Sequence, residues 1–122
     1  MLIAVWIVTG LVAIANLASG GMKALRPLPA LHPVMPFTKD VPPALTRFIG
    51  VAEVLGAIGI VLPVLTGIAP ILTPIAAVGL ALIQLIAFVF HLVRKEISPV
   101  LLANVLLFAL AVFVAVARFA GV

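Results

Sequence analysis

One acidic side chain, Glu53, lies deep inside an apolar stretch of the sequence, ten residues after Pro43. If this stretch is a helix that crosses a membrane, the spacing places the carboxyl group about 15 Å from the nearer membrane surface. A carboxyl group at this depth must become neutral, pair with a cation or face a polar cavity, because hydrocarbon does not solvate charge. Glu53 is therefore interpreted as a proton-exchanging base, a ligand-binding acceptor or a counter-ion. The competing interpretation is a neutral or salt-bridged structural group that ties helices together.

The three other apolar stretches each contain one amide side chain at a depth comparable to that of Glu53. These residues are Asn16, Gln84 and Asn104. Counted from the basic ends of their stretches, they lie about 8 to 10 Å inside a membrane span. We therefore expect the amides and Glu53 to form one polar layer across a helix bundle. The layer is either the floor of a ligand-binding cavity or a structural clasp, since interhelical hydrogen bonds stabilise such bundles by about 0.6 kcal/mol each on average.

Two basic residues and a histidine lie between this layer and the nearer membrane surface: Lys23, Arg47 and His91. Lys23 follows Asn16 by seven residues, and His91 follows Gln84 by the same interval. A separation of seven residues, close to two helical turns, places each pair on one helix face. We expect Lys23, Arg47 and His91 to form the rim of the cavity and the polar layer to form its floor.

His91 is also considered as a ligand of a metal or of haem. The only other histidine is His32, in a proline-rich segment, and the chain contains no cysteine. Two histidines without cysteine fall short of the donor sets of zinc sites, so no metal site is predicted. We expect His91 either to be a plain interfacial residue or to exchange protons or hydrogen bonds beside Glu53. The residues identify no cofactor.

The composition excludes a water-soluble globule. Of the 122 residues, 66% are hydrophobic and 8% are charged, whereas soluble domains contain about 45–50% apolar and about 25% charged residues. The lack of cysteine excludes disulfides, thiolate metal sites and thiol redox relays within the chain. No glycine-rich phosphate loop is present, and Gly20 with Gly21 is interpreted as the end of a helix. The chain is predicted to be an integral membrane protein whose surface contacts the lipid bilayer.

The predicted fold is all-α: a single domain, residues 1–122, that forms a four-transmembrane-helix bundle. The apolar runs are continuous, which favours helices over the alternating strands of a membrane barrel. The spans are expected at about 2–22, 44–64, 68–93 and 99–119. Six of the ten prolines lie in residues 23–43, so a proline-rich loop joins the first two helices. Small residues four apart favour close helix packing in every span: Ala15 and Ser19, Ala52 and Gly56, Ala77 and Ala81, Ala111 and Ala115.

Basic residues are distributed unequally between the two sides of this bundle. Six lie on the side of the first and third loops: Lys23, Arg26, Lys39, Arg47, Arg94 and Lys95. Arg118 alone lies on the side of the chain termini, where Trp6 and Phe119 are placed for the membrane interface. The positive-inside rule therefore predicts external termini and cytoplasmic basic loops, in the inner membrane of a bacterial cell. This topology accounts for the net charge of +4, so no nucleic-acid partner is expected.

Three stretches of the sequence and one histidine follow a familiar pattern. They are SGGMKAL at Ser19–Leu25, RFIGVAEVLGAIGIVLP at Arg47–Pro63, ILTPIAAVGLALI at Ile71–Ile83, and His91. The most specific part is Glu53 followed by the glycine-containing run at Gly56–Gly59. With these features the chain resembles the DoxX-like family of small four-helix membrane proteins over nearly its whole length. The resemblance implies the same four-helix fold and topology.

The resemblance also implies a range of functions. The family takes its name from a membrane subunit of a thiosulfate:quinone oxidoreductase, related chains are implicated in oxidative-stress complexes, and distant relatives include receptor-assembly chaperones. An accessory or binding subunit is thus expected, as a homo-oligomer or within a membrane complex, with an intramembrane pocket for a lipophilic, quinone-like ligand. Glu53 and His91 would exchange protons with such a ligand. The alternatives are a proton-coupled small transporter and a membrane enzyme that uses Glu53 and His91 as acid and base.

Overall fold

The protein consists almost entirely of helix. A computed structural model describes residues 1–31, 33, 41–95 and 99–122, so His32 and Lys39 lie outside the described residues. The helices are α1 (Leu2–Leu25), α2 (Leu28–Leu31), α3 (Pro43–Thr66), α4 (Leu72–Val93) and α5 (Pro99–Phe119). Four of them are long and apolar enough to cross a membrane, while α2 is a single short turn in the proline-rich loop. The predicted all-α, four-helix membrane fold is confirmed.

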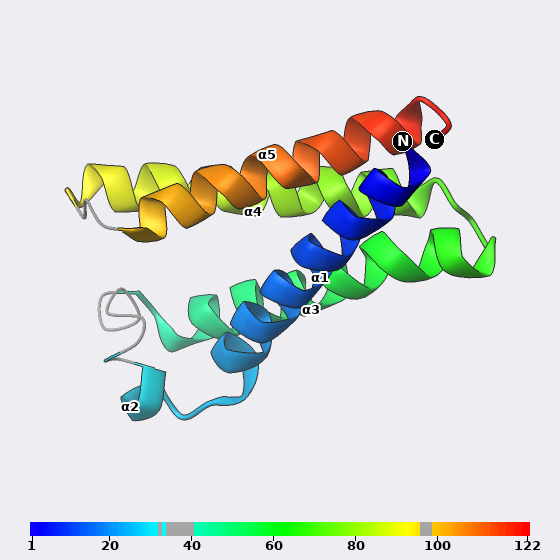
Figure 1. The fold of residues 1–122 in the computed structure, drawn as a ribbon. Helices are drawn as coiled ribbons and strands as arrows, with labels where there is room; N and C mark the ends of the chain where they lie inside the picture. The colour runs from blue at the N-terminus through cyan, green and yellow to red at the C-terminus, as the bar shows by residue number, and fades with distance from the viewer. Residues whose placement is uncertain (32, 34–40, 96–98) are drawn as a thin grey trace.

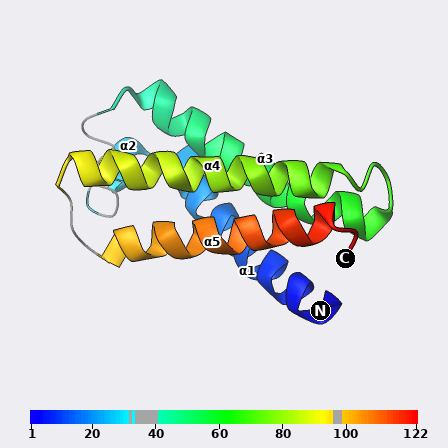
Figure 2. The same ribbon diagram turned by 90° about the horizontal axis from the view of Figure 1, so that it is seen from above.

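The four long helices form two antiparallel pairs. α1 packs along α3, α4 packs along α5, and α3 joins the pairs by packing on α4 (Figure 1). The two pairs cross at a wide angle, so α1 meets α5 near the chain termini and the pairs diverge towards the other end (Figures 1 and 2). We call the end that holds both termini the terminal end. The opposite end, where α1 and α4 finish, is called the basic end because five described basic residues lie there: Lys23, Arg26, Arg47, Arg94 and Lys95.

Helix boundaries follow from proline and glycine chemistry. α3 starts at Pro43, after Pro42 as its N-cap, where a missing N–H group leaves no helical hydrogen bond unmade. It ends at Thr66 with Gly67 as its C-cap, and the φ of 75° at Gly67 lets the Gly67 N–H group donate to the Pro63 carbonyl oxygen. α4 starts at Leu72, four residues after the predicted start of that span. The delay has a local cause, because Pro70 disfavours helical geometry at Ala69, which adopts a φ of 48°.

The interpretation of Gly20 and Gly21 as a helix terminus is wrong, because α1 continues to Leu25. Gly20 instead lies where α1 and α3 approach most closely. A Cβ atom at Gly20 would lie 2.6 Å from the Gly50 carbonyl oxygen, and one at Gly50 would lie 2.6 Å from the Ala24 backbone nitrogen. Helices can approach this closely only where both carry glycine. Gly20 and Gly50 therefore form a close backbone contact between α1 and α3, although neither belongs to the small-residue pairs predicted from the sequence.

The packed interior is small, and most large apolar side chains point away from it. Only 22–28% of the residues in each span are buried within the protein. The core contains small residues of α4 and α5, among them Ala77, Ala81, Ala111 and Ala115, together with Val12 and Ile60 from the other pair. The many large apolar side chains that face outward require a lipid environment, because their exposure to water is unfavourable.

Candidate functional site

The four polar residues predicted to form a layer all point into the bundle. Each of the four long helices contributes one of them: Asn16, Glu53, Gln84 and Asn104. Their exposed fractions are 1%, 1%, 7% and 8%. Burial of this degree is costly for amide and carboxyl groups unless they have partners. The contacts of each side chain therefore determine what the layer can do.

Helix register relates Glu53 to its predicted neighbours on α1 and α4. A Cβ atom at Gly20 would lie 2.8 Å from the Glu53 Cβ atom, so Glu53 sits directly on the α1–α3 crossing. Asn16 and Lys23 lie one turn to either side of Gly20 along α1. Between α3 and α4, Gly56 packs on Leu80. Glu53 and Gln84 each lie about one turn from this contact towards the basic end, Glu53 on α3 and Gln84 on α4.

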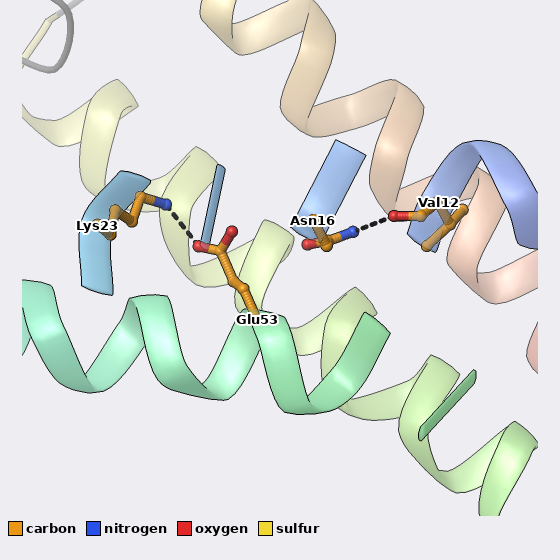
Figure 3. Close-up of polar contacts among 4 residues, drawn as sticks. All are labelled: Val12, Asn16, Lys23 and Glu53. Carbon is orange, nitrogen blue, oxygen red and sulfur yellow. Dashed lines mark hydrogen bonds and ion pairs between the residues drawn. The ribbon is translucent and has the colours of Figure 1, made fainter. Parts of the chain in front are cut away.

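Glu53 forms an ion pair across the crossing of α1 and α3. The Lys23 ammonium nitrogen lies 2.5 Å from the Glu53 Oε1 atom, and the two side chains are 13% and 1% exposed (Figure 3). The sequence predicted Lys23 at the rim of a cavity, yet its side chain reaches the layer itself. At its Oε1 atom, Glu53 is therefore a salt-bridged group that ties α1 to α3, as the structural interpretation expected.

Arg47 supports the same crossing from the basic end. Its Nη1 atom donates a hydrogen bond of 2.8 Å to the Lys23 carbonyl oxygen. This carbonyl belongs to the last turn of α1, where helical hydrogen-bond partners run out. A cation is also favourable at this position because it faces the negative end of the helix dipole. Arg47 thus holds the end of α1 against the start of α3.

Among the residues that the structure describes, several atoms of the layer have no hydrogen-bond partner. Asn16 uses its Nδ2 atom to donate to the Val12 carbonyl oxygen at 2.8 Å, which leaves its Oδ1 atom without a partner (Figure 3). Glu53 Oε2, Gln84 Oε1 and Asn104 Nδ2 are likewise buried without a partner. An unsatisfied buried polar atom costs about 1–3 kcal/mol. Three acceptors and one donor of the layer are therefore available to a bound group.

His91 lies towards the basic end, away from the level of Glu53. It follows Gln84 by two helical turns, or about 10 Å along α4. Its half-buried ring meets the edge of Phe90 at a centroid distance of 5.7 Å, and Arg94 lies over the same phenyl ring at 5.2 Å. Over the part of the chain that the structure describes, no three His, Cys, Asp or Glu side chains gather into a possible metal site.

Two surface hollows are apolar and lie outside the layer. One lies between α4 and α5 towards the terminal end and is lined by residues such as Ala81, Phe108 and Val112. The other lies between α1 and α3 and is lined by residues such as Gly21 and Leu55. Neither hollow is lined by a residue of the layer, so they hold no polar group of the candidate site.

A known protein family covers most of the chain. The family model of the DoxX-like family matches residues 7–114. The protein belongs to the DoxX-like family. No curated protein and no solved structure matched the chain. The matched range of this DoxX-like protein contains the whole layer and the three residues predicted for its rim.

Sequence reasoning missed the buried threonines of this DoxX-like protein, among them Thr46 and Thr73. Thr46 is fully buried on α3, and its hydroxyl oxygen has no hydrogen-bond partner in the described part of the chain. A signal was present, since Thr46, Gly50, Glu53 and Ala57 follow one another at intervals of four, three and four residues. This spacing places them on a single helix face. The buried face of α3 is therefore polar and small from the basic end to the middle of the bundle.

A second missed contact lies at the terminal end. The Arg118 guanidinium lies over the Trp6 indole ring, 5.1 Å from its centroid, and joins α5 to α1. Its Nη1 atom donates to the Val122 carbonyl oxygen at 2.8 Å. Both Trp6 and Arg118 lie outside the range that the family model matches. The sequence assigned Arg118 only to topology and Trp6 only to the membrane interface.

Proposed function

We propose that this DoxX-like protein is a membrane binding or accessory subunit that takes the polar end of a lipophilic ligand at its buried polar layer. The observation that carries the proposal is the set of unpartnered atoms on Asn16, Glu53, Gln84 and Asn104. Each helix places one such residue inside the bundle, where lipid cannot supply a hydrogen bond. A ligand with an apolar body and a polar end would satisfy these atoms from within the membrane.

The basic end is the proposed side of entry. The two helix pairs diverge towards this end, whereas Trp6 and Arg118 join α1 to α5 at the other (Figure 1). Lys23 is more exposed than Glu53 and lies on the basic side of it. A ligand that arrives along this path would meet Lys23 and His91 before it reaches the layer. Under the positive-inside rule, the proposal includes a basic end that faces the cytoplasm of a bacterial cell.

The family resemblance favours a ligand of the quinone class, whose reduced quinol form carries hydroxyl donors, and a place in a redox complex. The chain contains no cysteine, so it supplies no thiol for electron transfer. In such a complex this protein would hold and orient the ring, and a partner would carry the electrons. Assembly as a homo-oligomer or with that partner belongs to the same proposal.

Native mass spectrometry of the full chain tests the proposal. Protein extracted gently from its own membrane is compared with Glu53→Gln and with Thr66→Val, a control at the exposed end of α3. We expect a discrete lipophilic mass bound to the parent and to Thr66→Val, and its loss from Glu53→Gln. Circular dichroism shows whether Glu53→Gln is still folded. An oligomer without a bound lipophilic mass in all three preparations would overturn the proposal.

A further inference from the structure

We propose that the polar layer prefers neutral lipophilic ligands that donate hydrogen bonds, such as phenols and alcohols, over ligands of the same shape that only accept them. This inference rests on the proposed function and concerns the chemical class of the ligand. It follows from the kinds of atoms that the layer leaves without partners. Two of these atoms are assigned by contacts within the protein.

The first assigned acceptor is the amide oxygen of Asn16. An amide can be turned so that its oxygen and nitrogen change places, but the hydrogen bond to the Val12 carbonyl requires the nitrogen on that side. In Figure 3 the Asn16 nitrogen faces Val12, and its oxygen faces the side of Glu53. The oxygen is buried without a partner. A bound group must therefore donate a hydrogen bond to satisfy it.

The second assigned acceptor is the Oε2 atom of Glu53. A carboxylate accepts at both oxygens, and Lys23 occupies only Oε1. Glu53 lies between Lys23 and Asn16 in Figure 3, so its free oxygen and the Asn16 oxygen belong to one region of the bundle. Gln84 Oε1 adds a third acceptor from α4. The one unpartnered donor of the layer is Asn104 Nδ2. The oxygen of a ligand hydroxyl group can accept a hydrogen bond from this atom while the hydroxyl hydrogen is donated to one of the acceptors.

The charge of the site favours a neutral donor over a cationic one. Lys23 and Glu53 form an ion pair and cancel each other within the bundle. An ammonium ligand would add an uncompensated charge beside Lys23 in a medium that solvates charge poorly. A hydroxyl group donates a hydrogen bond without this cost. The layer is therefore suited to a lipophilic alcohol or phenol.

A matched pair of probes tests the inference. 4-Hexylphenol and 4-hexylanisole share one body, but the second carries a methyl ether and has no donor. Binding of each to the full chain in lipid nanodiscs is measured by isothermal titration calorimetry, with empty nanodiscs as the correction for partitioning. We expect the phenol to bind about tenfold more tightly, which is the effect of one net hydrogen bond. In Asn16→Leu the preference should fall to about threefold or less, while the control Thr66→Val should keep it.

The outcomes separate this inference from the function on which it rests. If both probes bind the parent equally above the nanodisc background, the donor preference is wrong and the binding role stands. If neither probe binds, the binding role is contradicted as well. Should Asn16→Leu fail to fold, Gln84→Met removes a second acceptor and provides the same comparison. Retention of the full preference in the folded variants of both positions would also overturn the inference.

Discussion

The crossing of α1 and α3 predicts that two adjacent glycines respond in opposite ways to alanine. At Gly20 an added Cβ atom would lie 2.6 Å from the Gly50 carbonyl oxygen, 2.8 Å from the Glu53 Cβ atom and 3.0 Å from the Val54 nitrogen. At Gly21 an added Cβ atom would have no neighbour within 4 Å apart from the surrounding backbone of α1. To restore an ordinary contact of 3.4 Å, Gly20→Ala must move the helices apart by about 0.8 Å. Such a movement strains the Lys23–Glu53 ion pair, which spans the same crossing.

The magnitude follows from a comparison of the two variants. Alanine favours helix over glycine by up to about 1 kcal/mol, and this gain is common to both positions. Inserting a methyl group into a packed contact costs about 1–3 kcal/mol. We therefore expect Gly20→Ala to be less stable than Gly21→Ala by about 1–3 kcal/mol. Gly50→Ala should be destabilised similarly, because its Cβ atom would lie 2.6 Å from the Ala24 nitrogen.

The assay is reversible unfolding in mixed micelles, followed by circular dichroism as the fraction of denaturing detergent rises. Gly10→Ala provides a second control within α1, since no atom lies within 4 Å of its added Cβ. Equal stability of Gly20→Ala and Gly21→Ala would refute the close crossing and, with it, the placement of Glu53 beside Gly20.

Three further predictions concern the charged side chains. Lys23→Met leaves Glu53 without its cation, so the free energy of unfolding should fall by about 3–5 kcal/mol; adding Glu53→Gln, which removes the unpaired charge, should recover most of this loss. Arg47→Gln removes the guanidinium that donates to the Lys23 carbonyl oxygen, so amide hydrogen exchange should become faster in the last turn of α1 and stay unchanged in α4. Unchanged exchange in α1 would contradict a stabilising role for this hydrogen bond. Arg118→Leu removes the cation that lies over Trp6, the single tryptophan, so the fluorescence emission of Trp6 should shift and the free energy of unfolding should fall by about 0.5–1 kcal/mol. An identical emission spectrum would argue against the contact.

The helices of this protein were predictable because the residue types within each segment are enough to indicate a membrane span. Backbone N–H and C=O groups must be hydrogen-bonded inside a bilayer, and a helix is the structure that pairs all of them within one continuous apolar segment. The residues that mark ends, Pro43, Gly67 and Pro99, act through their own backbone geometry, and α3 and α5 begin where these prolines lie. Predictions at Gly20 and at the start of α4 were wrong where packing or a turn competed with the local pattern.

The candidate site was predictable only in part. One polar residue inside each span is visible in the sequence, and depth alone places Asn16, Glu53, Gln84 and Asn104 in the middle region of a bundle. Their inward orientation, by contrast, depends on how each helix is rotated about its axis. Hydropathy carries little information on rotation here, because the faces that meet lipid and the faces that meet protein are both apolar.

The sequence by itself thus determined the membrane environment, the four helices and the set of polar residues that require partners, since these follow from the residue types and their distances along the chain. Only the tertiary structure decided which partners they have. Lys23 reaches Glu53, and Arg47 reaches the end of α1, because Gly20 and Gly50 allow two helices to approach more closely than any other residues would. The physical reason is that a close contact depends on two surfaces at once, and each segment of sequence specifies only one of them.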